Sequence, residues 1–331
     1  MQRRVLNPKL PHLTAAEMGF KVTVCIAALC NQKRKIVAVS DTKTSFGVFS
    51  ADDISIKSIP IAKNWIALQA GEDVTDAQFI TDRARELLIP NVSPTPIEAS
   101  TALQDAYIER TRKQVEAQVF ARYGYTWEAF RQSGKADLTK KIFNELAERA
   151  AGVTLSIQFI LAGFDSDGQG HLYTVDGERA PASWDTVGFC AIGTGSNVAL
   201  STLTFHVDRG NLSTYFGWAD CVCCVCDAKF RSESATDVGK GTFLTIYERD
   251  QDTRFISRVR IDNDLRTDWE RRAKLPKRVI ESIPDKTFTI DELFTKEGVR
   301  RFFGAKRTRG RQTMQENEML KRAVAHHDQK V

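Results

Sequence analysis

The first change of hydrophobic pattern along the chain marks a β-hairpin. Residues 23–30 and 36–41 run apolar or alternate, and the polar residues 31–35 separate them. Short apolar runs that flank a polar turn are typical of paired antiparallel strands. Two more short strands are expected at 54–61 and 65–70.

Helical spacing takes over at residue 75. Apolar side chains recur at three- and four-residue intervals over 75–88, which predicts an amphipathic helix, and prolines follow it. Residues 97–150 are expected to be mostly helical, with a loop at Gly134 and a second helix over 138–151.

Strands return in the second half of the chain. They are expected at 156–162, 170–175, 187–192 and 242–247, with a weaker candidate at 255–261. Helices are expected after Ser196 as far as about Phe205, and over 212–230. Because strands and helices come in blocks, the sequence predicts an α+β fold with helices layered on sheets.

Composition is that of a globular protein, with 42% apolar and 27% charged residues in a chain of 331. No apolar run approaches the roughly 18 residues of a membrane span. The first 22 residues are basic but lack an apolar stretch of signal-peptide length. We therefore expect a cytoplasmic protein that is neither exported nor membrane-bound.

Seven cysteines in a chain without an export signal favour reduced thiols. Four of them lie within 221–226, but a zinc site usually draws its four ligands from two separate elements. There is no second cluster, and His206 is the only nearby imidazole. Apolar helix packing is the favoured interpretation, and we expect no metal and no cofactor.

The net charge of +5 is concentrated in residues 251–331, while the rest of the chain is nearly neutral. The most basic run, 306–311, has no aromatic residue within it to stack on bases. Phosphate binding by such a run would be salt-sensitive. Charge runs are more often solvated, so nucleic-acid binding is not expected.

Four residues near the predicted strands offer the chemistry of a hydrolytic site. Thr23 supplies a hydroxyl at the head of the first strand, and Asp41, Lys57 and Gly71 follow downstream. A threonine hydroxyl becomes nucleophilic when a base lies within reach, and a free α-amine with a pKa of about 8 is such a base. The set therefore indicates an N-terminal threonine nucleophile, if Thr23 becomes an N-terminus.

Each of these residues also has a purely structural interpretation. Thr23 can be a strand former, since threonine favours strands. Lys57 can be a solvated surface lysine, and Asp41 can cap a turn with Thr42. Gly71 can simply permit a tight bend. Both interpretations stay open on the sequence alone.

In their order and spacing, these features resemble the proteasome β-subunit type of N-terminal nucleophile hydrolase, including its bacterial relatives, over roughly residues 23–250. The stretches that carry the resemblance are Thr23-Val24-Cys25-Ile26-Ala27, Ser40-Asp41, Lys57, Ala70-Gly71, Asp76-Ala77-Gln78-Phe79, Ala162-Gly163-Phe164-Asp165, Ile192-Gly193-Thr194-Gly195-Ser196 and Asp237-Val238-Gly239-Lys240-Gly241.

The resemblance implies a four-layer α-β-β-α sandwich in which Thr23 attacks a peptide carbonyl and its own amine takes the proton. It implies that Lys57 lowers the proton affinity of the hydroxyl and that Asp41 holds Lys57 in place. The N–H of Gly71 is implied to meet the developing oxyanion. Two further residues are implied to orient the amine and its water, Thr194 and Asp237.

The implied organisation has three parts, the second of which contains an insertion. Residues 1–22 form a leader or propeptide, and 23–250 form the hydrolase-like domain with a helical insertion at about 110–150. Residues 251–331 form a basic, partly disordered extension.

The implied function is a threonine-type hydrolase that cleaves amide bonds of peptides or proteins as a homo-oligomer, with an ATPase unfoldase partner left open. The alternative is a catalytically inactive proteasome-like subunit or interaction protein.

Two departures from the family pattern concern the start of the domain and its last loop. Lys21-Val22 precede Thr23 where the family usually has a glycine that is cleaved away, and the β-branched Val22 crowds the turn that self-cleavage needs. Translation from a GUG codon at Val22 would instead let methionine aminopeptidase expose Thr23. Lys240 stands where the family usually places a serine.

Overall fold

The computed structural model describes residues 23–46, 49–51, 57–71, 74–91, 93–177, 179–235, 238–249, 255–261 and Trp269. Its strands are β1 (Val24–Cys30), β2 (Lys35–Asp41), β3 (Thr44–Phe46), β4 (Phe49–Ala51), β5 (Ser58–Ala62), β6 (Trp65–Gly71), β7 (Ile157–Phe164), β8 (Gly170–Val175), β9 (Ala182–Ser183), β10 (Phe189–Gly193), β11 (Thr242–Arg249) and β12 (Phe255–Ile261). Its helices are α1 (Val74–Leu88), α2 (Pro96–Val115), the π-helical η1 (Glu116–Phe120), the 3-10 helix η2 (Ala121–Tyr123), α3 (Trp127–Asp137), α4 (Lys140–Ala151), α5 (Ser196–Asp208) and α6 (Trp218–Ser232).

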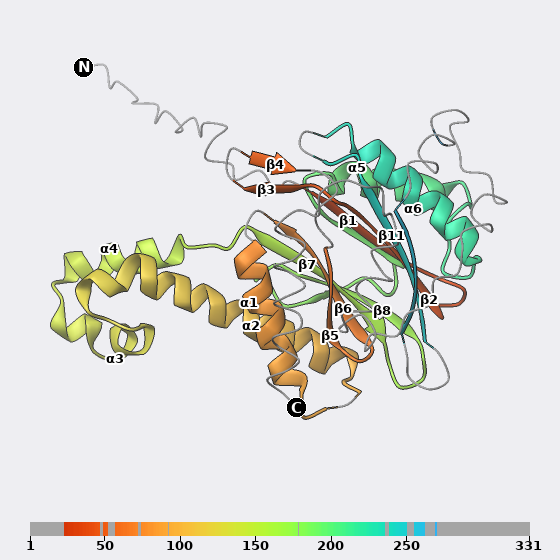
Figure 1. Cartoon of the computed structure of the whole chain (residues 1–331). Helices are drawn as coiled ribbons and strands as arrows, with labels where there is room; N and C mark the ends of the chain where they lie inside the picture. The colour runs from red at the N-terminus through yellow and green to blue at the C-terminus, as the bar shows by residue number, and fades with distance from the viewer. Residues whose placement is uncertain are drawn as a thin grey trace, which may run out of the picture.

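Most of the strands form two five-stranded antiparallel sheets (Figure 1). The first sheet has the order β10-β1-β2-β11-β12 and the second has the order β5-β6-β7-β8-β9, while β3 and β4 pair only with each other. The β1–β2 hairpin pairs antiparallel with Ile26 opposite Val39, as the apolar pattern predicted. The predicted α+β class with helices on sheets is confirmed.

Three apolar cores fill the spaces between these elements. One lies between the two sheets, one between the first sheet and the helices α5 and α6, and one between the second sheet and α1 and α2. Strand β1 serves two of the cores, because Cys25 and Ala27 face the second sheet while Val24 and Ile26 face the helices. A strand that is buried on both faces reads as a continuous apolar run, which explains the start of the sequence pattern.

Beyond the core, α2 continues into η1, and α3 and α4 fold back on it to form an arm that extends from the sheets (Figure 1). The arm has its own apolar cluster, in which the Phe130 ring stacks on Phe120 at 4.3 Å and on Phe143 at 5.0 Å between ring centroids. The predicted loop at Gly134 is wrong, because Gly134 lies inside α3 against the Phe130 ring. The helix predicted over 138–151 begins at Lys140.

The sequence also placed the start of α6 too early. That helix was expected from Leu212 but begins at Trp218, after Gly217. The segment before Trp218 is hydrogen-bonded to the β1–β2 turn instead of continuing a helix, since the carbonyl of Phe216 accepts a 2.7 Å hydrogen bond from the N–H of Asn31. Tertiary contact, not helical spacing, therefore decides the conformation before α6.

The expected leader and most of the basic extension lie outside the described residues, so the expected domain boundaries stay predictions. Within the described part of the chain, no helix combines the length and apolar character that crossing a membrane requires.

An ion cluster closes the β7–β8 hairpin against the segment that follows β9. His171 on β8 lies between two carboxylates, with Nδ1 2.7 Å from Asp185 and Nε2 3.2 Å from Asp165. Burial alone would lower the pKa of His171, but the hydrogen bonds and charges of Asp185 and Asp165 outweigh burial and raise it.

This raised pKa predicts a pH-dependent contribution to stability. A group with a raised folded pKa stabilises fully below its unfolded pKa of about 6.5 and loses that contribution as the pH rises through the folded value. The free energy of unfolding of the parent should therefore exceed that of His171→Gln by more at about pH 6 than at about pH 9. Urea unfolding at both pH values measures this, and an equal difference at both would contradict it.

Candidate functional site

Thr23 lies directly before β1 at the edge of the space between the sheets. Its exposed fraction is 1%, and its carbonyl accepts a 3.3 Å hydrogen bond from the N–H of Gly195. Gly193 has a φ of +89°, and a Cβ there would overlap the carbonyl and side chain of Thr23. The turn at residues 193–195 therefore holds the backbone of Thr23 closely, which explains Gly193. A Cβ on Gly195 would instead meet the Cβ of Ser232 at 2.9 Å.

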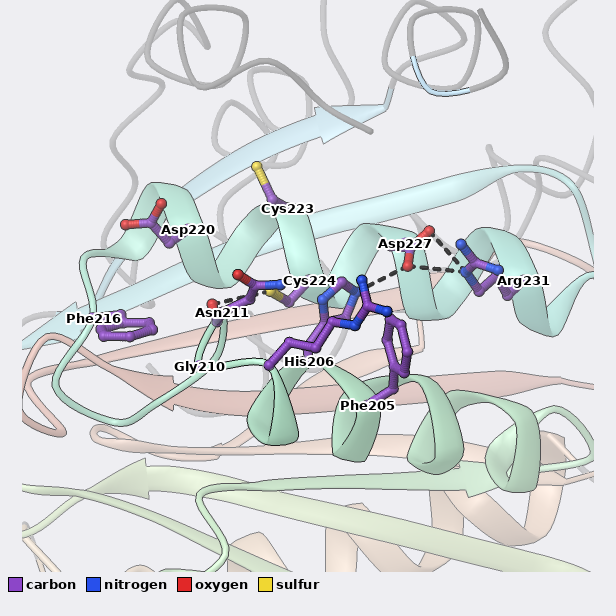
Figure 2. A pocket seen from close by; sticks show the side chains of 11 residues that line it. Phe205, His206, Gly210, Asn211, Phe216, Asp220, Cys223, Cys224, Asp227 and Arg231 are labelled. Carbon is purple, nitrogen blue, oxygen red and sulfur yellow. Dashed lines mark hydrogen bonds and ion pairs between the residues drawn. The ribbon is translucent and has the colours of Figure 1, made fainter. Parts of the chain in front are cut away.

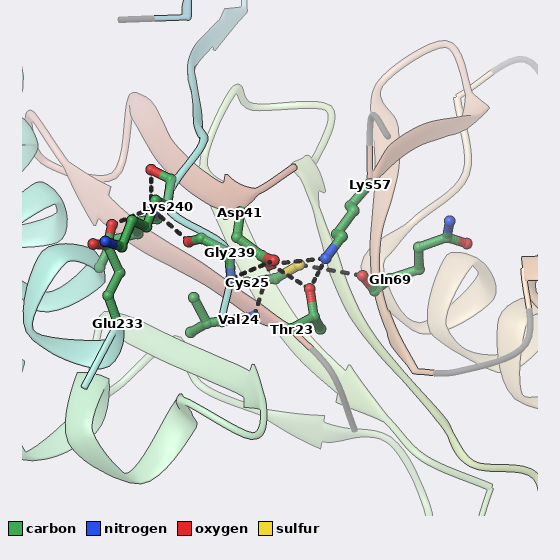
Figure 3. A network of polar contacts seen from close by, with 10 residues as sticks. Thr23, Val24, Cys25, Asp41, Lys57, Gln69, Glu233, Gly239 and Lys240 are labelled. Atoms are coloured by element: carbon green, nitrogen blue, oxygen red, sulfur yellow. Dashed lines mark hydrogen bonds and ion pairs between the residues drawn. The ribbon is translucent and has the colours of Figure 1, made fainter. Parts of the chain in front are cut away.

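Asp41, the last residue of β2, is the centre of the site (Figure 3). Its residue exposure is 0%. Its Oδ1 accepts hydrogen bonds from the hydroxyl of Thr23, from the N–H of Val24 at 2.9 Å and from the ammonium of Lys57 at 2.8 Å. Its Oδ2 accepts the N–H of Gly239 at 3.2 Å. The carboxylate is satisfied by donors from separate parts of the chain, as a buried anion requires.

Lys57 reaches this carboxylate from the second sheet. It precedes β5, and its carbonyl accepts the N–H of Gln69 on β6 at 2.8 Å. Its ammonium donates both to Asp41 and to the hydroxyl of Thr23. The interpretation of Lys57 as a solvated surface residue is wrong, because its side chain is 7% exposed and forms an ion pair.

The hydroxyl of Thr23 therefore contacts both members of the Asp41–Lys57 ion pair, which also contact each other. Its proton is donated to the Asp41 carboxylate and its lone pair accepts the Lys57 ammonium. A hydroxyl has one donor and two lone pairs, so this arrangement satisfies the proton and fixes the direction of the oxygen. An ammonium beside the oxygen favours the build-up of negative charge on it.

Gly71 ends β6, two residues beyond Gln69. A Cβ at this position would overlap the carbonyl of Ser156 and meet the Cα of Ile157 at 2.9 Å. Close approach of the β7 end therefore accounts for the glycine without any role in chemistry, and the oxyanion role stays a prediction.

The remaining two predicted site residues are Thr194 and Asp237. The Oγ1 of Thr194 is buried and has no hydrogen-bond partner in the described part of the chain, and the orienting role stays a prediction. Asp237 lies outside the described residues. Lys240, the departure from the family pattern, is exposed, as a lysine directed to solvent would be.

Sequence reasoning missed two donors and one buried lysine. The N–H groups of Val24 and Gly239 bind Asp41, but backbone donors leave no signal in side-chain identity. Gly239 did fall within a stretch that carried the resemblance. Lys229 on α6 is completely buried near Gly239, and its sequence neighbours gave no sign of this.

Cys25, on β1 two residues after Thr23, is a second potential nucleophile. Burial raises the pKa of its thiol to about 12, and the opposing effect of Lys57 is smaller. The thiol donates a 3.2 Å hydrogen bond to the carbonyl of Gln69. A thiol that stays protonated is a poor nucleophile, so Thr23 is the stronger candidate.

A separate cavity of about 600 Å³ lies between α5 and α6 (Figure 2). None of the residues around Asp41 lines it. In it, His206 Nε2 lies 2.9 Å from Asp227 Oδ2, and burial raises the pKa of the Cys224 thiol to about 12. Among the described residues, no group of three or more His, Cys, Asp or Glu side chains is arranged to hold a metal ion.

Comparison with known protein families gives a match in the middle of the chain. A family model described as proteasome subunit matches residues 130–215, from within α3 to the segment before α6. No curated protein matches the chain. The match supports a proteasome-like family assignment, and Thr23, Asp41 and Lys57 lie outside the matched residues.

The buried ion pair predicts a large effect of Lys57→Met on stability. Removing one partner leaves the Asp41 carboxylate buried without its counter-ion, which typically costs about 3–5 kcal/mol. Lys35→Met is the matched control, because Lys35 pairs with Glu248 at the other end of β2 with side chains 18% and 22% exposed. Its cost should be smaller, because both of these side chains reach solvent and the Glu248 carboxylate left behind stays partly hydrated. Denaturant unfolding measures both, and equal losses would contradict the arrangement described.

Proposed function

From the proteasome-like family assignment, we propose that the chain is a threonine-type N-terminal nucleophile hydrolase that cleaves amide bonds in peptides. The observation that carries this proposal is the position of the Thr23 hydroxyl, hydrogen-bonded to the Asp41 carboxylate and to the Lys57 ammonium at the head of β1. Both charged groups are buried, so their effect on the hydroxyl is only weakly screened.

In the proposed reaction, the free α-amine of Thr23 takes the hydroxyl proton through a water molecule. The oxygen attacks the peptide carbonyl, an ester forms to Thr23, and the amine portion of the substrate leaves with a proton. Water then hydrolyses the ester. Lys57 stabilises the charge that develops on the oxygen, and Asp41 holds Lys57.

The other predicted site residues keep their roles within this proposal. The N–H of Gly71 would meet the oxyanion, where one such donor is worth roughly 3 kcal/mol. Thr194 and Asp237 would orient the amine and its water. The unpartnered hydroxyl of Thr194 is compatible with that role, since a water bound to it would be its partner.

The proposal extends to fold and assembly. One core lies between α5 and α6 and the first sheet, one between the two sheets, and one between the second sheet and α1 and α2. These three cores support a four-layer α-β-β-α sandwich. Proteasome-like proteins assemble into oligomers and act on peptides, so we propose a cytoplasmic homo-oligomer with peptide or protein substrates. The chemistry uses only side chains, an amine and water, and therefore calls for no cofactor.

A second candidate function is a non-catalytic member of the same family. The burial of Thr23, which is 1% exposed and follows Val22 in the sequence, favours this function. An amide nitrogen has no basic lone pair, so a chain that keeps Val22 attached has no α-amine at the site.

The first prediction of this proposal concerns the N-terminus. Protein expressed from the native gene, with its start codon unaltered, should begin at Thr23, because the proposed base is the α-amine of that residue. Intact mass and N-terminal sequencing measure this. A chain that keeps Val22 would favour the non-catalytic function instead.

The second prediction concerns activity. In protein that begins at residue 23, Thr23→Ala and Lys57→Ala should each lower kcat for peptide hydrolysis by about 10³-fold or more, because each removes a group that acts at the reacting oxygen. Thr23→Ser keeps the hydroxyl and should retain measurable turnover. Lys35→Ala, at the far end of β2, is the control and should keep the parental rate. Parental hydrolysis by either of the first two variants would show that the assigned site is wrong.

A further inference from the structure

Lys229 is a completely buried lysine that the proposed chemistry does not use. It lies in the last turn of α6, and its side chain is 0% exposed. Removing an ammonium from water costs several kcal/mol unless its charge and its donors are matched. A sequence that keeps a cation here must compensate for that cost with specific partners.

The partners of Lys229 connect the end of α6 to the segment before β11. The ammonium forms an ion pair with Glu233 and donates to the carbonyls of Gly239 and Lys240, both at 3.1 Å. These three acceptors match the three donors of an ammonium. Lys229 therefore fixes the position of two consecutive peptide groups at residues 239–240.

The same segment reaches Asp41. The N–H of Gly239 donates to Asp41 Oδ2 at 3.2 Å, while the other carboxylate oxygen is occupied by Thr23, Val24 and Lys57. Figure 3 shows this connection from Lys240 through Gly239 to Asp41. The N–H and C=O of Gly239 belong to adjacent peptide groups that meet at its Cα, so holding the carbonyl also anchors the Cα to which the N–H group is bonded.

We propose that Lys229 is a positioning residue for the hydrolytic site. By holding residue 239, it keeps a donor on Asp41 Oδ2, and this donor sets the rotation of the carboxylate that presents Oδ1 to Thr23 and Lys57. The inference rests on the proposed function for its effect on catalysis, but its structural part stands on the contacts alone.

A simpler role would be to stabilise the C-terminal end of α6, where cations are favourable. Arg231 already lies in that turn, half exposed and bonded to Asp227 by its Nε at 2.9 and 3.0 Å. Lys229 instead bonds to carbonyls beyond the helix, and an ammonium needs no burial to interact with a helix end. The contacts favour the loop as the part that Lys229 holds.

The test uses the double variant Lys229→Met/Glu233→Gln, which removes both charges and leaves neither unpaired. Its matched control is Lys35→Met/Glu248→Gln, which makes the same two changes in the pair that joins β2 to β11 away from Asp41. In protein that begins at Thr23, the Lys229 double variant should lower kcat about tenfold or more with KM unchanged. The control should keep both constants.

Hydrogen–deuterium exchange provides a readout that does not depend on activity. The Lys229 double variant should speed exchange in the peptide that covers 238–246 more than in the peptide that covers 218–232. Faster exchange confined to α6 would show that Lys229 only stabilises the helix and would overturn the proposal. If the Lys229 double variant keeps the parental kcat although exchange at 238–246 is faster, the proposed effect of Lys229 on catalysis is wrong.

Two remaining outcomes are also decisive. If the parental protein that begins at Thr23 hydrolyses no peptide, the proposed function fails, and exchange alone decides whether Lys229 holds Gly239. If the double variant does not fold, Lys229→Leu/Glu233→Leu, which fills the same space with two apolar side chains and removes every donor, takes its place. Parental exchange at 238–246 in that folded variant would overturn the proposal.

Discussion

The Asp41 carboxylate is the constraint on which the rest of this structure depends. A carboxylate with 0% exposure is costly unless its oxygens are matched by donors, and here they come from the start of β1, from Lys57 before β5 and from Gly239 before β11. Lys57 directly precedes a strand of the second sheet, and the other donors lie in or just before strands of the first. One buried anion therefore joins the two sheets at the end where Thr23 lies.

Strand β1 explains why Thr23 stands at that point. Side chains alternate along a strand, so Thr23 shares the side of Cys25, which faces the second sheet. Gly193 on β10 lacks the Cβ that would overlap Thr23, and the N–H of Gly195 in the turn before α5 donates to the carbonyl of Thr23. A residue at the head of a strand buried on both faces has little freedom to move, which gives the hydroxyl a fixed direction before any substrate arrives.

What the sequence could predict depended on how local the cause was. The β1–β2 hairpin and α1 follow from spacing within a few residues, and both are found close to their expected bounds. Gly134 was expected to break a helix, but the Phe130 ring packs where a larger residue would collide, and α3 continues through it. The side-chain identities of Thr23, Asp41 and Lys57 suggested one site, whereas the backbone donor at Gly239 and the buried Lys229 depend on tertiary contacts that no local pattern reports.

The geometry also changes how the pairing of Asp41 with Lys57 should be interpreted. A subunit that has lost catalysis need not keep both residues for chemistry, and on that ground their presence argues for activity. Yet a buried ion pair is costly to break from one side, since the remaining charge is left without a partner. Single substitutions would therefore be disfavoured even in an inactive chain, and the pair alone does not separate the two functions. What separates them is the bond at the nitrogen of Thr23: an amide there leaves the hydroxyl as one more donor to Asp41, whereas a free amine adds a base beside it.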